Sequence, residues 1–301
     1  MVAFLGLAEV MAQQRPVISQ YMLNGLVLNP AYAGRHEYSS FSVMYRDQWV
    51  NVPGAPKLAV ASAQTGFKGK KIGVGLLLAN DALGMHDNQS VYASYAYNLE
   101  LINGGKISMG VQAGFDRLRE DPNVLNIRDD GDSQFAGVNV RYLPNFGTGV
   151  FYHDDYNYLG VSVPYILSNR DVQNEEFTEI YKMPRYYYVT AGRLIEAGPR
   201  LIIKPSMLLR IQEQNPFAFD ANINFYIDDI IGLGASYRFG DSVIGIFEFQ
   251  INQFIKFSYA YDYVFSNLTQ FTKGTHELML NYRINFSAPR KHRMCPGPLY
   301  F

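Results

Sequence analysis

The side chains that most often perform chemistry in proteins show no catalytic arrangement in this sequence. None of the five histidines has the spacing that puts two imidazoles on one face of an element for metal binding; they are His36, His86, His153, His276 and His292. No Gly-x-Ser-x-Gly motif and no Cys/His nucleophile pair in a recognisable context occurs. We therefore expect no catalytic, cofactor-binding or metal site, and we expect that the protein is not an enzyme.

Two acidic motifs are candidate cation sites. His153-Asp154-Asp155 falls between two predicted strands, where Asp and Asn are common because they favour turns. Asp129-Asp130-Gly131-Asp132 lies in the longest predicted loop, about 117–145, and lacks the ligand spacing and closing Glu of an EF-hand. We therefore interpret 153–155 as a turn and 129–132 as part of a solvated loop, in preference to cation sites. Loops of that length are usually functional or disordered, so 117–145 is a candidate plug or docking surface. The single Cys295 has no partner for an intramolecular disulfide.

The remaining charged side chains follow a two-residue period. In 201–210 the apolar residues Leu201, Ile203, Met207 and Leu209 alternate with polar ones, so one face suits lipid and the other suits water. The five segments that follow repeat this pattern, and every charge in them falls on the non-lipid face. These candidate lumen charges are Lys204, Arg210, Asp220, Arg238, Glu248, Lys256, Asp262 and Arg283.

Such two-faced segments recur along most of the chain. The alternation predicts about fourteen strands, near 39–49, 57–67, 71–80, 89–99, 106–116, 146–153, 157–164, 185–195, 201–210, 217–225, 231–239, 243–251, 255–263 and 278–286. A long series of such strands is satisfied by a closed barrel with an apolar outside and a polar inside. We therefore predict an all-β fold, a transmembrane antiparallel up-and-down β-barrel in the outer membrane of a Gram-negative cell.

The composition agrees with a barrel. Hydrophobic residues make up 48% of the chain, the mean hydropathy is −0.11, and no stretch approaches the roughly 20 apolar residues of a membrane helix. The 23 Tyr and 20 Phe suit aromatic girdles at the membrane interfaces. A soluble sandwich is the alternative, but fourteen strands are long for one domain. A net charge of −1 with scattered basic residues argues against nucleic acid as a partner.

The ends of the chain complete the predicted domain organisation. Residues 1–12 resemble a residual signal peptide cleaved before Gln13, with a basic start lost upstream; a short buried helix is the alternative. Residues 13–37 are predicted as an N-terminal periplasmic segment, 38–286 as the barrel, and 287–301 as a C-terminal periplasmic tail. An even strand count returns both ends to the periplasm. On this numbering the turns at Gly69-Lys70 and Phe239-Gly240-Asp241 are periplasmic.

The predicted lumen carries charges of both signs. Adding Arg46, Lys106, Asp116 and Glu277 to the eight charges above gives seven positive and five negative side chains. A mixed set does not describe a strong anion or cation filter, and opposite charges can pair across the interior and close it. We expect an occluded barrel in preference to a wide diffusion pore.

Several short motifs near the N-terminus have a physical interpretation, and together they also resemble a known family. Asn29-Pro30 favours a non-helical turn, and Gly34 permits a backbone bend before the first strand. Arg46 is expected to pair with an acid inside the barrel, and Trp49 suits the membrane interface. Together these motifs resemble the start of the PorP/SprF family of Bacteroidetes outer-membrane proteins. They are Ser19-Gln20-Tyr21, then Asn29, Pro30, Ala31, Tyr32 and Gly34, then Arg46, Asp47, Gln48 and Trp49, then Pro53, Gly54, Ala55 and Pro56.

The resemblance continues to the end of the predicted barrel. Further matching words are Gly73-Val74-Gly75, Tyr95-Ala96-Tyr97, Pro144-Asn145-Phe146-Gly147, Gly160-Val161-Ser162-Val163-Pro164 and Gly274-Thr275-His276-Glu277. The resemblance implies a non-catalytic component of the type IX secretion and gliding-motility system. It also implies partners, namely outer-membrane lipid, the periplasmic ring and peptidoglycan-linked subunits of the machinery, and a cargo with a C-terminal sorting domain.

Three hypotheses follow from the sequence. The first is a secretion component that anchors or receives cargo without being its conduit, because a fourteen-strand barrel filled by its own side chains is too narrow for a folded protein. The second is an outer-membrane porin or selective channel. The third is a barrel enzyme, which would need a Ser, His or Asp constellation near one rim, and the sequence supplies none.

Overall fold

The structure is a computed structural model that describes residues 18–35, 38–67, 71–102, 104–122, 137–167, 184–213, 217–265 and 272–284. Its strands are β1 (Ser39–Asp47), β2 (Lys57–Gly66), β3 (Ile72–Leu83), β4 (His86–Glu100), β5 (Lys106–Glu120), β6 (Asn139–His153), β7 (Asn157–Val163), β8 (Tyr186–Arg193), β9 (Ile195–Glu196), β10 (Leu201–Gln212), β11 (Ala218–Ile227), β12 (Ile231–Arg238), β13 (Ser242–Gln250), β14 (Ile255–Val264) and β15 (Thr275–Ile284).

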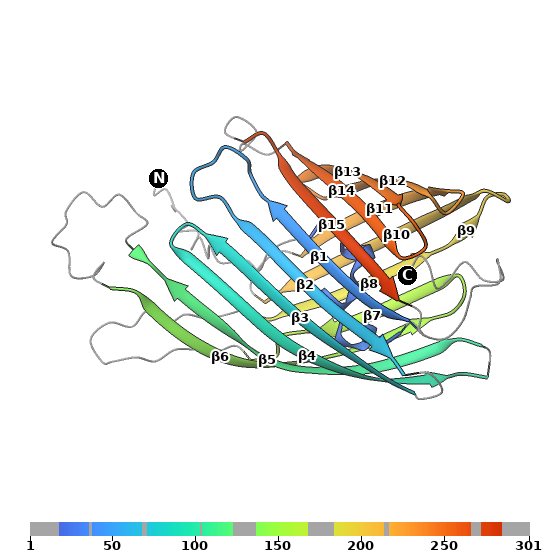
Figure 1. Cartoon of the computed structure of the whole chain (residues 1–301), viewed down its shortest axis with the longest axis horizontal. Coiled ribbons are helices and arrows are strands. Elements are labelled where there is room, and N and C mark those ends of the chain that lie inside the picture. Colours follow the sequence, from blue (N-terminus) through green and yellow to red (C-terminus); the bar gives the residue numbers. More distant parts are fainter. Residues whose placement is uncertain are drawn as a thin grey trace, which may run out of the picture.

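These strands form one closed antiparallel barrel (Figure 1). Each strand pairs with its neighbours in the chain, and β1 closes the sheet by pairing with β15, from Ser39 opposite Ile284 to Asp47 opposite His276. The short β9 pairs with β10, as β8 does, so β8 and β9 are one wall strand interrupted at Leu194. The wall therefore has fourteen strands, and the predicted barrel is confirmed.

The two-residue period of the sequence becomes the inside and outside of this wall. In β13 the burial alternates along the whole strand, with Ser242 and Ile244 buried and Val243 and Phe247 exposed. Exposed large apolar side chains recur in the same way around the barrel, for example Val111, Leu233 and Leu280. Their outward face is the surface that hydrocarbon stabilises and water does not.

The longest predicted loop is shorter than expected. The sequence placed a loop at about 117–145, but β5 continues to Glu120 and β6 begins at Asn139, where the two residues pair. The extension carries Arg117 and Arg119, which interrupt the apolar face that identified the strand. A strand that projects beyond the bilayer needs no apolar outer face, so the alternation ends before the hydrogen bonding does. The acidic words from Asp129 to Asp132 lie outside the described residues.

The two ends of the barrel differ in the length of their connections. The connections at the end where β1 begins are all short; they are 67–71, 101–105, 154–156, 197–200, 228–230 and 251–254. The opposite end carries the longer connections 48–56, 121–138, 164–185 and 265–274, together with the short ones 84–85, 213–217 and 239–241. Because barrels have short periplasmic turns and longer outer loops, we infer that β1 starts at the periplasmic end. The order of the wall strands places Phe239-Gly240-Asp241 at the outer end. The connection that contains Gly69-Lys70 is at the periplasmic end, and these two residues lie outside the described residues. The expectation that both turns are periplasmic is therefore corrected.

Residues 18–35 lie inside the barrel, where they form what we call the plug. Its three short 3-10 helices are η1 (Tyr21–Leu23), η2 (Gly25–Val27) and η3 (Pro30–Tyr32), seen as dark blue coils within the barrel in Figure 1. The sequence placed 13–37 in the periplasm as one segment; the described part instead fills the lumen. Its apolar side chains explain this position, since Tyr21, Leu26 and Ala31 are buried against the wall.

Three buried clusters join the plug to the wall. One contains Leu26, Ala31 and Tyr32 with Phe151 and Tyr158; a second contains Tyr21, Met22 and Leu28 with strands β8, β10, β13 and β14. The third, near the outer end, joins Ile18 to Tyr92, and to Tyr165 from the outer connection 164–185. None of the helices among the described residues is long and apolar enough to cross a membrane. The predicted signal peptide 1–12 and tail 287–301 lie outside the described residues.

Candidate functional site

A buried ion cluster holds the outer part of the plug. Arg46 of β1 contacts Asp262 at 2.8 Å and Glu277 at 2.9 Å, and all three side chains are almost completely buried. Pairing of β1 with β15 puts Arg46 directly opposite Glu277, while Asp262 of β14 pairs with Thr275. The sequence expected Arg46 to pair with an acid inside the barrel, and the structure supplies two. We call these three residues the Arg46 cluster.

The start of the plug binds to this cluster through its backbone. The amides of Ser19 and Gln20 each donate to Glu277, to Oε2 and Oε1 respectively, at 2.9 Å. The Ser19 hydroxyl donates to Asp262 at 2.7 Å and accepts from Arg46 at 2.8 Å. A carboxylate that accepts several N–H groups away from water forms strong, charge-assisted bonds. The two carboxylates of the Arg46 cluster therefore neutralise Arg46 and position the plug at the same time.

A second ion group continues around the wall from the Arg46 cluster. Arg238 contacts Asp220 at 3.2 Å and Asp262 at 3.5 Å, and Arg210 lies 3.8 Å from Asp220. Asp241, in the turn after β12, adds a contact to Arg238 at 3.6 Å. Four of the eight candidate lumen charges, Arg210, Asp220, Arg238 and Asp262, thus join Arg46 and Glu277 in one connected network on β1, β10, β11, β12, β14 and β15.

The remaining lumen charges sit closer to the periplasmic end. Lys256 contacts Glu248 at 3.1 Å, and Glu248 also accepts from Asn224 and Tyr226 at 3.0 Å. Lys204 lies above the ring of Tyr158, with 5.6 Å from Nζ to the ring centre, and Arg283 lies above Tyr38. Two predicted lumen charges stand apart from these groups. Asp116 accepts from Ser90 and Tyr92, and the half-exposed Lys106 contacts Glu100 at 3.3 Å.

The family motif at the end of the plug, which begins with Asn29 and Pro30, forms the second attachment of the plug to the wall. Asn29 caps η3 by accepting from the Ala31 amide at 2.9 Å, and its amide group donates to the backbone oxygens of Val150 and Val161. Pro30 occupies the first position of η3, where its missing N–H costs nothing. The non-helical turn predicted at Asn29-Pro30 is therefore corrected: Asn29 is extended, but Pro30 starts a short 3-10 helix that is held on β6 and β7.

The wall makes room for this attachment with glycine. A Cβ on Gly110 of β5 would lie 2.2 Å from the Ala31 nitrogen, so only glycine lets the plug approach here. Gly34 has φ +61° and would bring a Cβ to 2.3 Å from the Cα of Gly73. The sequence singled out Gly34 and Gly73, and Ser19 and Gln20 as part of a family motif without a physical role, but not Gly110. An inward-facing glycine in the middle of a strand was the available signal.

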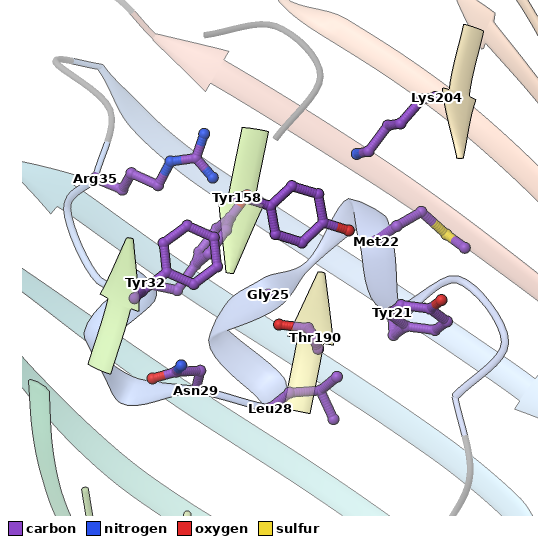
Figure 2. A pocket seen from close by; sticks show the side chains of 11 residues that line it. Tyr21, Met22, Gly25, Leu28, Asn29, Tyr32, Arg35, Tyr158, Thr190 and Lys204 are labelled. Carbon is purple, nitrogen blue, oxygen red and sulfur yellow. The ribbon is translucent and has the colours of Figure 1, made fainter. Parts of the chain in front are cut away.

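A small cavity of about 30 Å³, partly open to solvent, remains between the plug and the wall (Figure 2). Arg35 and Lys204 both point into it (Figure 2), and Tyr32, Phe151 and Tyr158 are among the residues that line it. The Arg35 guanidinium lies 5.1 Å from the ring centres of both Tyr32 and Phe151. Arg35 is only 8% exposed, so this side chain lies in a poorly solvated place.

A second group of family motifs lies at the outer rim. Connection 48–56 lines a cleft of about 400 Å³, together with Asp47, Lys57, Ala82 and Gly84; we call it the rim cleft. Trp49, Pro53, Gly54 and Ala55 are among its walls, while Gln48 and Pro56 close the loop through a backbone bond at 3.0 Å. The sequence predicts Trp49 at the membrane interface. In the structure Trp49 lies in this outer loop, and its backbone amide donates to the Thr275 hydroxyl.

The rim cleft has an unusually constrained backbone. Trp49 and Asn51 both have positive φ, at 52° and 77°, a region that non-glycine residues rarely occupy. Backbone bonds hold the loop in place, from Val50 to Gly274 at 3.0 Å and from Gly84 to Gly54 at 3.0 Å. Such backbone strain persists only where the surroundings enforce it, and it concentrates at binding sites.

The described residues offer no metal centre, since no group of three or more His, Cys, Asp or Glu side chains among them is placed to hold an ion. In the motif 153–155, Asp154 accepts hydrogen bonds from the backbone amides of Tyr156 and Asn157 and from the Asn157 side chain. This is the arrangement of a turn. Cys295 and His292 lie outside the part of the chain that the structure describes.

The fold and the lumen define the class of this protein. A closed fourteen-strand barrel with an apolar outer band and a polar, filled interior is an outer-membrane β-barrel. Comparison with known families gives the particular one. The model of the type IX secretion system membrane protein PorP/SprF matches residues 10–282, so the chain belongs to that family, as its short sequence words had indicated.

Solved structures share the barrel fold at low sequence identity. The P. putida toluene transporter TodX is 10% identical over 88% of this chain and 94% of TodX, with a TM-score of 0.50. A TodX monoaromatic hydrocarbon channel variant, deltaS2, is 11% identical over 87% and 94% of the two chains, with a TM-score of 0.54. These likenesses establish the fold alone. None of the curated proteins matches this chain.

Proposed function

We propose that this protein is a non-catalytic receptor of the type IX secretion system, which holds a cargo protein by its C-terminal sorting domain at the outer face of the membrane. It also docks to the secretion machinery, through the periplasmic ring and peptidoglycan-linked subunits. The observation that carries the proposal is the combination of family membership with a lumen filled by the plug. A barrel whose interior is occupied by its own chain favours an anchor over a conduit.

The rim cleft is the surface we assign to cargo. It lies at the outer end by the loop-length rule, and it combines an aromatic side chain, Trp49, with a rigid and strained loop. Aromatic side chains in preformed clefts often dominate the binding energy of protein interfaces. The short periplasmic turns leave the machinery to dock at the opposite end, so the two sets of partners meet different ends of the barrel.

The first experiment compares the surface and culture-medium proteins of a gene deletion and its parent by quantitative proteomics, with a plasmid-borne wild-type copy as the control. Loss of one large cargo identifies a dedicated receptor, and loss of all sorting-domain cargo identifies a core component. An unchanged secretome contradicts the proposal.

A second strain carries Trp49→Ala on the plasmid, and a third carries Phe67→Ala, an exposed aromatic residue at the periplasmic end. If cargo docks at the rim cleft, only Trp49→Ala releases cargo into the medium while both barrels assemble normally. Equal cargo retention in the two strains rules out the rim cleft as the docking surface.

The channel alternative has a direct test. A passive channel conducts in planar bilayers as the wild-type protein, whereas a plugged receptor conducts only after its plug is loosened. Open conductance by the wild-type barrel, together with an unchanged secretome, would favour the channel. The names of the TodX structures do not favour it, because at 10% and 11% identity they share only the fold.

A further inference from the structure

The outward faces of β3, β4 and β5, which lie side by side in the wall (Figure 1), change from apolar to polar at one level near the outer end. The last apolar residue and the first polar residue of each strand stand in two cross-strand rows. The apolar row is Leu78, Val91 and Phe115, and the polar row is Asn80, Gln89 and Arg117. Because the apolar band of a barrel faces the hydrocarbon of the bilayer, the polar row lies at the level of the lipid headgroups.

Arg117 is the charged member of the polar row, and it is oriented without being neutralised. Its guanidinium donates to the Gln89 side-chain oxygen at 3.2 Å, and among the described residues no carboxylate forms an ion pair with it. Arg119, on the same face but farther out, contacts Asp121 at 2.8 Å and stands opposite Asp87. The two arginines therefore differ, because only Arg117 presents a charge that still needs a counter-ion.

The neighbours of Arg117 suit a headgroup that is rich in hydroxyl groups. Asn80 and Gln89 each carry an amide that can donate and accept hydrogen bonds. Tyr142 of β6 stands directly opposite Arg117 and adds a phenol hydroxyl on a side chain that is 63% exposed. Because neighbouring strands lie about 4.8 Å apart, the row from β3 to β6 is about 14 Å long. One cation and three neutral groups over this length match a phosphorylated sugar headgroup better than an isolated phosphate.

The surface below the polar row suits acyl chains. Leu78 and Phe115 are 41% and 42% exposed on the outward face. The ring of Tyr142 lies near that of Phe115, with 6.2 Å between the ring centres, so the polar row continues into the apolar one without a break. A ligand that matches both rows has a charged, polar headgroup and a hydrocarbon body.

We infer that the row of Asn80, Gln89, Arg117 and Tyr142 binds the phosphorylated sugar headgroup of a lipopolysaccharide molecule in the outer leaflet. Arg117 binds the phosphate, whose oxygens match the two-pronged geometry of a guanidinium. The two amides and the phenol bind sugar hydroxyl groups, and the acyl chains lie on the apolar row. The site faces lipid and is independent of the cargo docking proposed above, so a failure of either leaves the other standing.

Native mass spectrometry of the purified full-length protein in detergent tests the site. The probes are diphosphorylated lipid A, the same lipid after removal of its phosphates, and phosphatidylglycerol. The wild-type barrel is expected to bind lipid A, and removal of the phosphates to raise the dissociation constant roughly tenfold, because a charge-assisted contact is lost. Phosphatidylglycerol is expected to bind more weakly than lipid A, because it has a phosphate but no sugar.

Arg117→Gln removes the charge, and Arg119→Gln is the matched control because it removes the same charge one row farther out on the same strand. The dissociation constant of lipid A is expected to rise roughly tenfold in Arg117→Gln and to stay within about twofold in Arg119→Gln. Gln89→Ala removes the group that orients Arg117 and provides a second variant, with an expected rise of roughly threefold. Heat-modifiable migration confirms that each barrel is folded.

Three results would each overturn the inference. The first is an equal loss of lipid A binding in Arg117→Gln and Arg119→Gln, which would mean that only net charge matters. The second is equal binding of lipid A with and without its phosphates. The third is binding of phosphatidylglycerol as tight as that of lipid A, which would mean that the row recognises any anionic lipid.

Discussion

Replacing Glu277 is expected to release the plug without unfolding the barrel. Its carboxylate accepts the amides of Ser19 and Gln20 and also contacts Arg46. The contact with Arg46 lies between two wall strands and is present whether the plug is in or out, so it cancels from the release equilibrium. The two hydrogen bonds from the plug amides do not cancel, because they exist only when the plug is docked.

The size of the effect follows from those two bonds. A hydrogen bond to a charged group contributes ~1.5–3 kcal/mol, so Glu277→Ala weakens docking by about 3 kcal/mol at the lower end of that range. Because each 1.4 kcal/mol is a factor of ten, the released fraction rises roughly 100-fold. Glu277→Gln retains one acceptor oxygen and is expected to raise the released fraction roughly tenfold.

The assay measures how often the plug leaves the lumen. In a Cys295→Ser background, Met22→Cys places one thiol on the buried face of η1, where only a released plug reacts with a maleimide. The labelling rate then follows the released fraction if docking is faster than labelling. Glu100→Ala is the control, because Glu100 makes its ion pair with Lys106 at an exposed turn. Heat-modifiable migration confirms that every barrel is folded. Labelling of Glu277→Ala within threefold of the control would refute the assigned role of the carboxylate.

Three further predictions test the packing, the lipid face and a turn. Gly110→Val places side-chain atoms where Ala31 lies, so the barrel is expected to form while Met22→Cys labels at least tenfold faster; Gly245→Val, with open space around it, is the control. Val111→Arg, on the lipid face, is expected to destabilise the barrel by ~2–4 kcal/mol in a urea titration, and Val111→Leu by much less. Partial burial alone raises the pKa of Asp154, but hydrogen bonds from Tyr156, Asn157 and Tyr152 outweigh it and lower the pKa. The stability Asp154 contributes is therefore present above its ordinary pKa and lost as pH falls through the lowered one; urea titrations between pH 7 and pH 3 are expected to show this loss, and Asp154→Asn to lack it.

The barrel was readable from the sequence because its cause is local. A strand with one face in lipid must alternate, so runs such as Leu278, Leu280 and Tyr282 reveal both the strand and its orientation. The same rule found the lumen charges, including Arg46. It failed at Arg117 and Arg119, where β5 continues beyond the apolar band and the outward face no longer has to be apolar.

The plug was not readable because its partners are remote. Its short turns have no helical or strand period, and its first anchor joins Ser19 to Glu277 across 258 positions. The apolar residues of 18–35 showed that this segment needed burial, but not against what. The inward glycine at Gly110 carried part of the answer, because a strand interior without a side chain marks a place where another backbone approaches.

The lumen charges are better understood as plug supports than as a filter. A filter needs one sign of charge facing water, whereas Arg46, Asp262 and Glu277 are buried together and bonded to the start of the plug. Both carboxylates offset the buried arginine. Glu277 also accepts the backbone amides of Ser19 and Gln20, and Asp262 accepts the Ser19 hydroxyl, so polar groups of the plug are satisfied by the wall. Removing the plug would expose those groups to water and leave the arginine paired within the wall. We therefore expect the barrel to stay folded without its plug, so that closure is a separate equilibrium that mutations such as Glu277→Ala can shift on their own.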